Sequence, residues 1–223
     1  LLTVICRSKN RVIYAKEGFA IVAASWLFAA LIGAFPFVIS KEIPNYINAF
    51  FETVSGFTTT GASILENVEA MSHGMLFWRS FTHFIGGMGF LVFVMAIIPN
   101  ISDRSMHIMR AEVPGPVVGK LVPKIKDTAK ILYIIYFCMT VVEIIMLICG
   151  GMPAFDSVLL SFGSAGTGGF GIKSGSIASY SPYCQWVIGV FMMLFGINFN
   201  VYFLLLIKHF KSAAKTSEMW CYL

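Results

Sequence analysis

The chain has 223 residues, of which 57% are hydrophobic and 12% charged, and its mean hydropathy is +0.80. Because so few charged residues cannot coat a soluble globule, the composition excludes that class and predicts an integral membrane protein. The formal net charge is +5, and 13 of the 16 Lys and Arg residues lie before residue 19, between residues 104 and 130, or after residue 207. The five cysteines show no CxxC or metal-ligand spacing, so they imply no disulfide framework.

The first predicted element is a membrane span at Phe19–Ile39, which contains 21 residues without a charge. At a helical rise of about 1.5 Å per residue, this length crosses a hydrocarbon core of roughly 30 Å. Pro36, near the end of the span, predicts a kink or the end of the helix. Since the chain starts at Leu1 rather than at methionine, we also expect sequence upstream of it.

A short apolar segment, Ala49–Phe57, follows a polar stretch and is too short to span the membrane. It predicts a re-entrant half-helix with Asn48 as its N-cap. The polar residues after it, Thr58–Ile64 (TTTGASI), predict a loop held inside the membrane. This loop would lie at the C-terminal end of the half-helix, which carries partial negative charge.

The second span is predicted at Ser80–Ile98, directly after Trp78 and Arg79. Aromatic rings and long cationic side chains that snorkel toward water are typical of this interface depth. Small residues in a membrane helix let another backbone come close. The span contains three such residues, Gly86, Gly87 and Gly89.

The same order of elements occurs again after Pro99–Lys130, a charged connector that we predict to be an aqueous loop. The second set comprises a span at Ile131–Cys149, a half-helix at Asp156–Ala165 with Asp156 as its N-cap, a polar loop at residues 166–172 and a span at Trp186–Ile207. A shift of 108 positions pairs Thr59 with Thr167 and Gly61 with Gly169. The sequence therefore predicts two copies of one unit.

The predicted fold is an all-α integral membrane protein with two repeats, each made of a span, a re-entrant pore helix, a filter loop and a span. The repeats occupy residues 19–98 and 131–207. Residues 1–18, 99–130 and 208–223 are predicted to be an N-terminal flank, a connector and a truncated tail. Because these three segments carry most of the basic residues, the positive-inside rule places them, with both termini, on the cytoplasmic side of a multi-pass plasma membrane protein.

The two polar loops predict a pore or a binding cavity, because irregular backbone is tolerated at membrane depth only inside protein or along water. Glycine can adopt backbone angles closed to other residues and so turn successive carbonyls the same way, and a ring of carbonyls replaces the hydration shell of an alkali cation. The predicted selectivity-filter residues are Thr58, Thr59, Thr60, Gly61, Gly166, Thr167, Gly168 and Gly169. Two alternatives stay open: the glycines only form tight turns, or the threonine hydroxyls only cap the half-helix.

Two acidic residues fall inside the predicted membrane segments, and each has two interpretations. Glu52, in the first half-helix, is either functional or a structural acceptor for backbone groups behind the filter. Its equivalent in the second copy is Leu160, so the carboxylate is not needed by every repeat. Glu143, in the third span, is either a bundle-facing polar contact or part of an ion or proton path.

Four motifs resemble those of a known family. Residues 50–62 (FFETVSGFTTTGA), 76–81 (LFWRSF) and 86–89 (GGMG) are similar to the first pore repeat of the Trk/Ktr/HKT superfamily of potassium transporters, and residues 166–170 (GTGGF) to the second. The resemblance covers nearly the whole chain. It implies four repeats around one pore, with one filter glycine from each facing the ion. Glycine at position 61 implies a preference for potassium, because serine there goes with sodium transport in the family.

The resemblance also implies partners, namely a second copy of the full-length protein and a cytoplasmic nucleotide-binding regulatory subunit. The composition makes the lipid bilayer a further partner, and the basic connector is interpreted as a topology signal, so no nucleic acid is expected. Since only two of the four repeats are present, the chain is half of a longer protein, meets a second chain, or is inactive. We predict potassium uptake through a carbonyl filter, with K⁺ as the transported ion, no enzymatic activity and no covalently bound cofactor. An ion-coupled secondary carrier and a non-conducting truncated scaffold are the alternatives.

Overall fold

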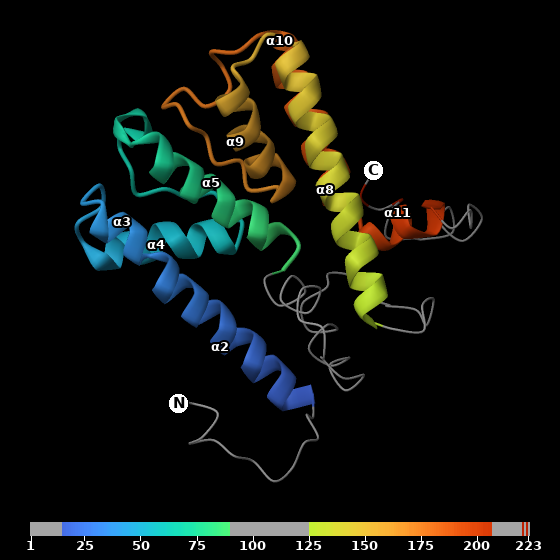
Figure 1. Ribbon diagram of the computed structural model, residues 1–223, viewed down its shortest axis with the longest axis horizontal. Coiled ribbons are helices and arrows are strands. Elements are labelled where there is room, and N and C mark those ends of the chain that lie inside the picture. Colours follow the sequence, from blue (N-terminus) through green and yellow to red (C-terminus); the bar gives the residue numbers. More distant parts are fainter. Residues whose placement is uncertain (1–14, 90–124, 207–219, 221, 223) are drawn as a thin grey trace.

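The computed structural model describes residues 15–89, 125–206, 220 and 222, and these parts of the chain form helices and loops without a strand (Figure 1). The helices before the connector are α2 (Ala15–Gly33), α3 (Phe35–Ile39), α4 (Tyr46–Phe57) and α5 (His73–Gly87), with a 3₁₀ turn η1 at Val68–Ala70. Those after it are α8 (Ile125–Cys149), α9 (Ala154–Ala165), α10 (Pro182–Gly196) and α11 (Phe199–Leu206). The prediction of an all-α fold is confirmed.

Two stretches of the described chain are long and apolar enough to cross a membrane, Phe19–Ile39 and Lys130–Cys149. They agree with the first and third predicted spans. The first is interrupted between α2 and α3, where Pro36 has no N–H to continue the helical hydrogen bonds. The indole Nε1 of Trp78 donates to the Gly33 carbonyl at this kink, at 3.0 Å. Of the two effects predicted for Pro36, a kink and the end of the span, the structure shows the kink.

The half-helices are α4 and α9, each 12 residues long. The first residue of α9 lies 108 positions after the first residue of α4, and their last residues are separated by the same number. At about 1.5 Å per residue, such a helix is roughly 18 Å long and cannot cross the membrane. Both predicted N-caps were wrong. The carboxamide of Asn45, not that of Asn48, accepts from the Ile47 amide at 2.9 Å, so α4 starts three residues earlier than expected.

Helix α9 also starts earlier than predicted, at Ala154 after Pro153. Asp156 therefore lies in the first turn of the helix instead of before it. Its carboxylate accepts a hydrogen bond from the Tyr180 hydroxyl at 2.8 Å, which fastens the loop between α9 and α10 to the start of α9. Burial, together with this carboxylate, raises the pKa of Tyr180 above its usual value, so the phenol remains a donor at neutral pH.

Helix α5 lies between α4 and α9 and packs against both (Figure 1). A Cβ atom on Gly86 would meet the Phe57 carbonyl at the end of α4, and one on Gly87 would lie 3.0 Å from the Ala165 carbonyl at the end of α9. Phe57 and Ala165 are equivalent residues of the two copies. The prediction that small residues allow close backbone approach is confirmed here, and α5 holds the C-terminal ends of α4 and α9 together.

The predicted fourth span is not one continuous helix. Helix α10 ends at Gly196, Ile197 is extended, and α11 turns away from the direction of α10 (Figure 1). The Tyr202 hydroxyl donates to the Leu194 carbonyl at 2.7 Å and the Tyr222 hydroxyl to the Met193 carbonyl at 3.2 Å. These bonds satisfy carbonyls at the end of α10 that a continuing helix would have used. Residues 90–98 of the second span lie outside the described residues, as does most of the connector.

Candidate functional site

The first loop begins where α4 ends, and its backbone folds back onto the helix. The Thr59 amide donates to the Gly56 carbonyl at 3.0 Å and the Thr60 amide to the Ser55 carbonyl at 2.9 Å, which is the Schellman pattern of a helix C-terminus. Thr59 has φ of 54° and Gly61 of 77°. A positive φ is uncommon for a β-branched residue, and such strained backbone concentrates at functional sites.

The second loop, at the end of α9, has the same backbone. The Thr167 amide donates to the Ser164 carbonyl at 2.8 Å and the Gly168 amide to the Gly163 carbonyl at 3.2 Å. Thr167 has φ of 55° and Gly169 of 73°. Each donor and each acceptor is 108 positions from its equivalent in the first loop. The repeat in the sequence is therefore also a repeat of backbone conformation and of hydrogen bonds.

Residues of positive φ alternate with residues of negative φ in both loops. Thr60, between Thr59 and Gly61, is not among the positive-φ residues of the described chain, and neither is Gly168 in the second loop. A regular strand points successive carbonyls in opposite directions, whereas alternating handedness turns them toward one side. Such backbone can present a row of carbonyl oxygens to a dehydrated alkali cation.

The two loops touch each other through their backbones. A Cβ atom on Gly61 would meet the Gly168 carbonyl oxygen, and one on Gly168 would lie 2.6 Å from the Thr59 carbonyl oxygen. The structure therefore brings the predicted filter residues of both repeats into one site. Glycine is required at these two positions because there is no room for a Cβ atom, and at Gly61 also because of the positive φ.

The threonine side chains of the first loop make internal contacts. The Thr58 hydroxyl donates to the Val54 carbonyl at 2.8 Å, and the hydroxyl oxygens of Thr58 and Thr60 lie 2.8 Å apart. The Thr59 methyl lies beside α5, 3.1 Å from where a Cβ on Gly86 would stand. The Thr58 hydroxyl thus caps the half-helix, in agreement with the alternative that the sequence left open.

A buried ion pair lies beside the two loops. Arg79, on α5, donates through Nε to Oε1 of Glu52, on α4, at 2.6 Å, and the two residues are 2% and 1% exposed. The prediction that Arg79 snorkels at the interface was wrong. Removal of a guanidinium from water is costly, and here a carboxylate in hydrogen-bonding geometry compensates that cost.

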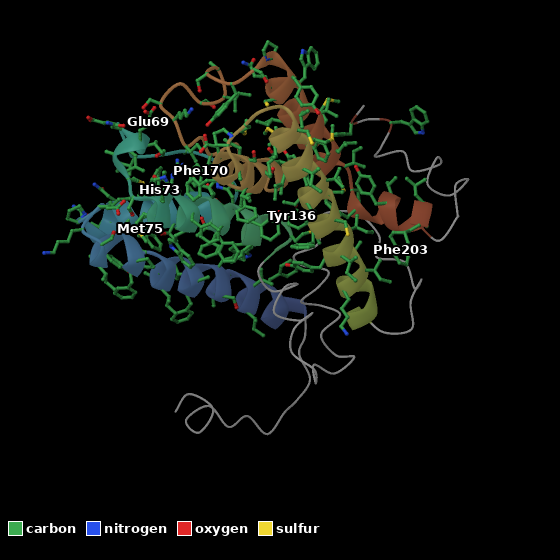
Figure 2. The ribbon with its side chains drawn as sticks, turned by 45° about the horizontal axis from the view of Figure 1, so that its top comes forward. Glu69, His73, Met75, Tyr136, Phe170 and Phe203 are labelled. Carbon is green, nitrogen blue, oxygen red and sulfur yellow. The ribbon has the colours of Figure 1, made fainter. Side chains whose placement is uncertain are left out.

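Sequence reasoning missed His83, which lies one helical turn after Arg79 on α5. His83 is fully buried, and its ring meets the edge of Phe170 with the centroids 3.9 Å apart. Figure 2 shows Phe170 inside the helix assembly and Glu69 on its outer rim. The spacing of four between Arg79 and His83 could have placed both on one helix face. Glu143, also fully buried, is on α8, which packs against α9.

A fold of apolar helices, two of them too short to cross a membrane and each followed by an irregular polar loop, is typical of integral membrane transport proteins. The family model TrkH, described as cation transport protein, matches residues 1–220. The chain therefore belongs to the TrkH family, within the superfamily that its motifs resemble.

Several potassium uptake proteins and a solved transporter structure are among the proteins similar to the chain. It is 40% identical over 195 residues to the Trk system potassium uptake protein TrkH of Salmonella typhimurium, covering 86% of this chain and 40% of that protein. It is 34% identical over 194 residues to TrkG of Escherichia coli, again covering 86% and 40%. The crystal structure of the potassium transporter TrkH from Vibrio parahaemolyticus matches with a TM-score of 0.70 and 29% identity over 95% of this chain and 42% of that one. The chain thus spans about two fifths of these relatives, which are transporters and not enzymes.

Proposed function

We propose that the chain forms two of the four pore repeats of a Trk/Ktr-type transporter, through which potassium is taken up across the plasma membrane. The observation that supports this most directly is the matching backbone of the two loops, with equivalent hydrogen bonds and positive φ at equivalent residues. A function that uses both loops in the same way would account for the occurrence of the same strained backbone in each.

In this proposal the ion is bound by backbone carbonyls of the two loops. The filter residues are Thr58, Thr59, Thr60, Gly61, Gly166, Thr167, Gly168 and Gly169. The C-terminal ends of α4 and α9, with their partial negative charge, point to the same place and favour a cation there. Gly61, in place of serine, supports potassium as the preferred ion.

The proposal requires partners, because two repeats do not enclose a pore. Residues 19–98 and 131–207 form the two repeats, and the other two come from further sequence of the same protein or from another chain. We also propose a dimer of the full-length protein, a cytoplasmic nucleotide-binding regulatory subunit, and a plasma membrane orientation with both termini in the cytoplasm. The match covers about two fifths of relatives that are more than twice as long, which supports the first of these requirements.

A chimaera tests the function. This chain replaces the matching part of Escherichia coli TrkH, to which it is 39% identical over 204 residues, in a strain that lacks its own potassium uptake systems. We expect growth at low potassium and saturable uptake of K⁺ or Rb⁺. A chimaera found in the membrane in normal amount, in association with its normal partners, but unable to take up potassium would contradict the proposal.

A further inference from the structure

The buried pair of Glu52 and Arg79 contacts both loops on the outer side of their filter residues. The Glu52 carboxylate accepts from the Ser63 hydroxyl at 3.0 Å and from the Ile64 amide at 3.0 Å, in the first loop. Arg79 donates through Nη1 to the Gly171 carbonyl at 2.8 Å, in the second loop. One ion pair thus joins two loops whose contacted residues, Ser63 and Gly171, are 108 positions apart along the chain.

The contacted positions are equivalent in the two repeats. Ser63 and Gly171 differ by the same 108 positions as the filter glycines, and each lies two residues after its glycine. The carboxylate holds donors of one loop, and the guanidinium, joined to that carboxylate at 2.6 Å, holds an acceptor of the other. The pair therefore fixes the outer end of one loop relative to the same point of the other.

The second repeat has no pair of its own. Residues equivalent to Glu52 and Arg79 are Leu160 and Val187, which cannot form hydrogen bonds through their side chains. Arg79 supplies the missing contact, and its guanidinium also lies 3.6 Å from the ring centroid of Phe170, next to Gly169. A planar group with several donors suits this task, because it can bond a carboxylate, bond a carbonyl and stack on a ring at once.

We propose that Glu52 and Arg79 are positioning residues that set the distance between the two filter loops and thereby the ion selectivity of the pore. This proposal rests on the proposed function, because selectivity has meaning only in a conducting assembly. Carbonyls discriminate potassium from sodium by the cavity they form around the ion, so a loop held in one position discriminates better than a loop that moves. The same pair also explains why the carboxylate is needed once in the two repeats.

The test replaces the pair by the residues of the second repeat, in the variant Glu52→Leu with Arg79→Val. This double change leaves no unpaired buried charge, so the fold is expected to survive, whereas either single change would leave one. Arg79→Lys tests the geometry of the guanidinium, because an ammonium keeps the positive charge but not the planar arrangement of N–H donors. Glu69→Gln is the matched control, since the Glu69 carboxylate also bonds the second half of the chain, at Ser174, but on the exposed rim.

Two readouts are combined. Spin labels at Ala62→Cys and Ser174→Cys, in a cysteine-free chain, report the distance distribution between the loops, and the chimaera reports the ratio of K⁺ to Na⁺ flux. We expect the double variant and Arg79→Lys to broaden the distribution and to lower the flux ratio by about tenfold, roughly the effect of one charge-assisted hydrogen bond. The control changes neither.

An unchanged distance distribution in the double variant would overturn the proposal, and so would an unchanged flux ratio in a variant whose distances have broadened. If the parent chimaera carries no potassium, the proposed function fails, and with it the role in selectivity. The distance measurement still decides whether the pair positions the loops, because it requires no transport. The two failures are therefore distinguishable.

Discussion

Gly61 and Gly169 have nearly the same backbone angle in different surroundings. Both have a positive φ, which costs about 1–2 kcal/mol for a residue with a side chain. A Cβ on Gly61 would meet the Gly168 carbonyl, whereas one on Gly169 would have the Met192 methyl as its nearest neighbour, at 3.8 Å. Comparison of the two positions therefore separates backbone strain from the contact between the loops.

We expect Gly169→Ala to lower the free energy of unfolding by about 1–2 kcal/mol, and Gly61→Ala by about 1–3 kcal/mol more, because only the latter also overpacks the loop contact. Thermal unfolding of the purified protein in detergent measures both. Gly74→Ala is the control, since Gly74 is helical with no atom within 4 Å of its would-be Cβ, and should be neutral or slightly stabilising. Equal losses at positions 61 and 169 would show that the loops are not in contact.

Gly61→Ser addresses selectivity at the same residue. In the chimaera, the serine side chain displaces the Gly168 carbonyl and introduces a hydroxyl beside it, so the ring of ligands changes in size and in composition. We expect the ratio of K⁺ to Na⁺ uptake to fall while total uptake persists. A ratio equal to that of the parent would identify Gly61 as a turn residue without a role at the ion.

At the scale of helices, the sequence predicted which elements exist better than where they start. Apolar length distinguishes a span from a half-helix, so α4 and α9 could be expected. The N-caps could not, because Asn45 and Asn48 are both good caps and the path of the incoming chain after Pro44 decides between them. The break after Gly196 could not be predicted either, because an apolar run does not report that two tyrosine hydroxyls will satisfy the released carbonyls.

The cap of α4 can be tested by replacing each of the two candidate residues with alanine. Asn45→Ala removes the acceptor of the Ile47 amide and should destabilise the protein by about 1 kcal/mol. Asn48→Ala, within the helix, should be neutral or slightly stabilising, because alanine has the higher helix propensity. Unfolding in denaturant, with both variants measured beside the parent, gives the two differences. A larger loss from Asn48→Ala would contradict the observed start of α4.

At the scale of the molecule, the repeat let the sequence place both loops at one site, since equivalent residues of two copies can surround one axis. The connection between the loops could not be predicted. From the sequence, Arg79 is predicted to be an interfacial cation. Its acceptor is the backbone carbonyl of Gly171, 92 positions away, and glycine has no side chain that would indicate the contact. Local pattern is informative on spans and half-helices, whereas a bond from a side chain to a distant carbonyl depends on the packing of α5 between α4 and α9.

The orientation that we propose for the molecule in the membrane rests on its basic residues. Cysteine labelling from outside, in a background without native cysteines, should modify Glu69→Cys, on the exposed rim beyond the loops, because that rim faces outward in our proposal. Lys120→Cys, in the basic connector outside the described residues, should stay unlabelled until the membrane is permeabilised. The reverse pattern would invert the topology.

In our proposal, the chain on its own presents the predicted filter residues, which form its filter face, to the surroundings. Thr58, Thr60 and Ala62 are exposed, and in hydrocarbon each unpaired carbonyl of such a loop costs several kcal/mol. Two repeats supply two sides of a pore, so a lone monomer in a bilayer would leave these carbonyls against lipid. That arrangement is unstable, and association through the filter face or partial unfolding relieves it.

We therefore expect the purified chain in liposomes to self-associate or to fold poorly, and to carry no potassium as a monomer. Crosslinking and flux are measured on the same vesicles, at protein-to-lipid ratios low enough to give one chain per vesicle and high enough to allow pairs. Crosslinks through single cysteines in the loops, and not through Lys173→Cys on the rim, would identify the filter face as the contact. Potassium-selective flux that persists at one chain per vesicle would refute both the need for four repeats and the position of these loops at a shared pore.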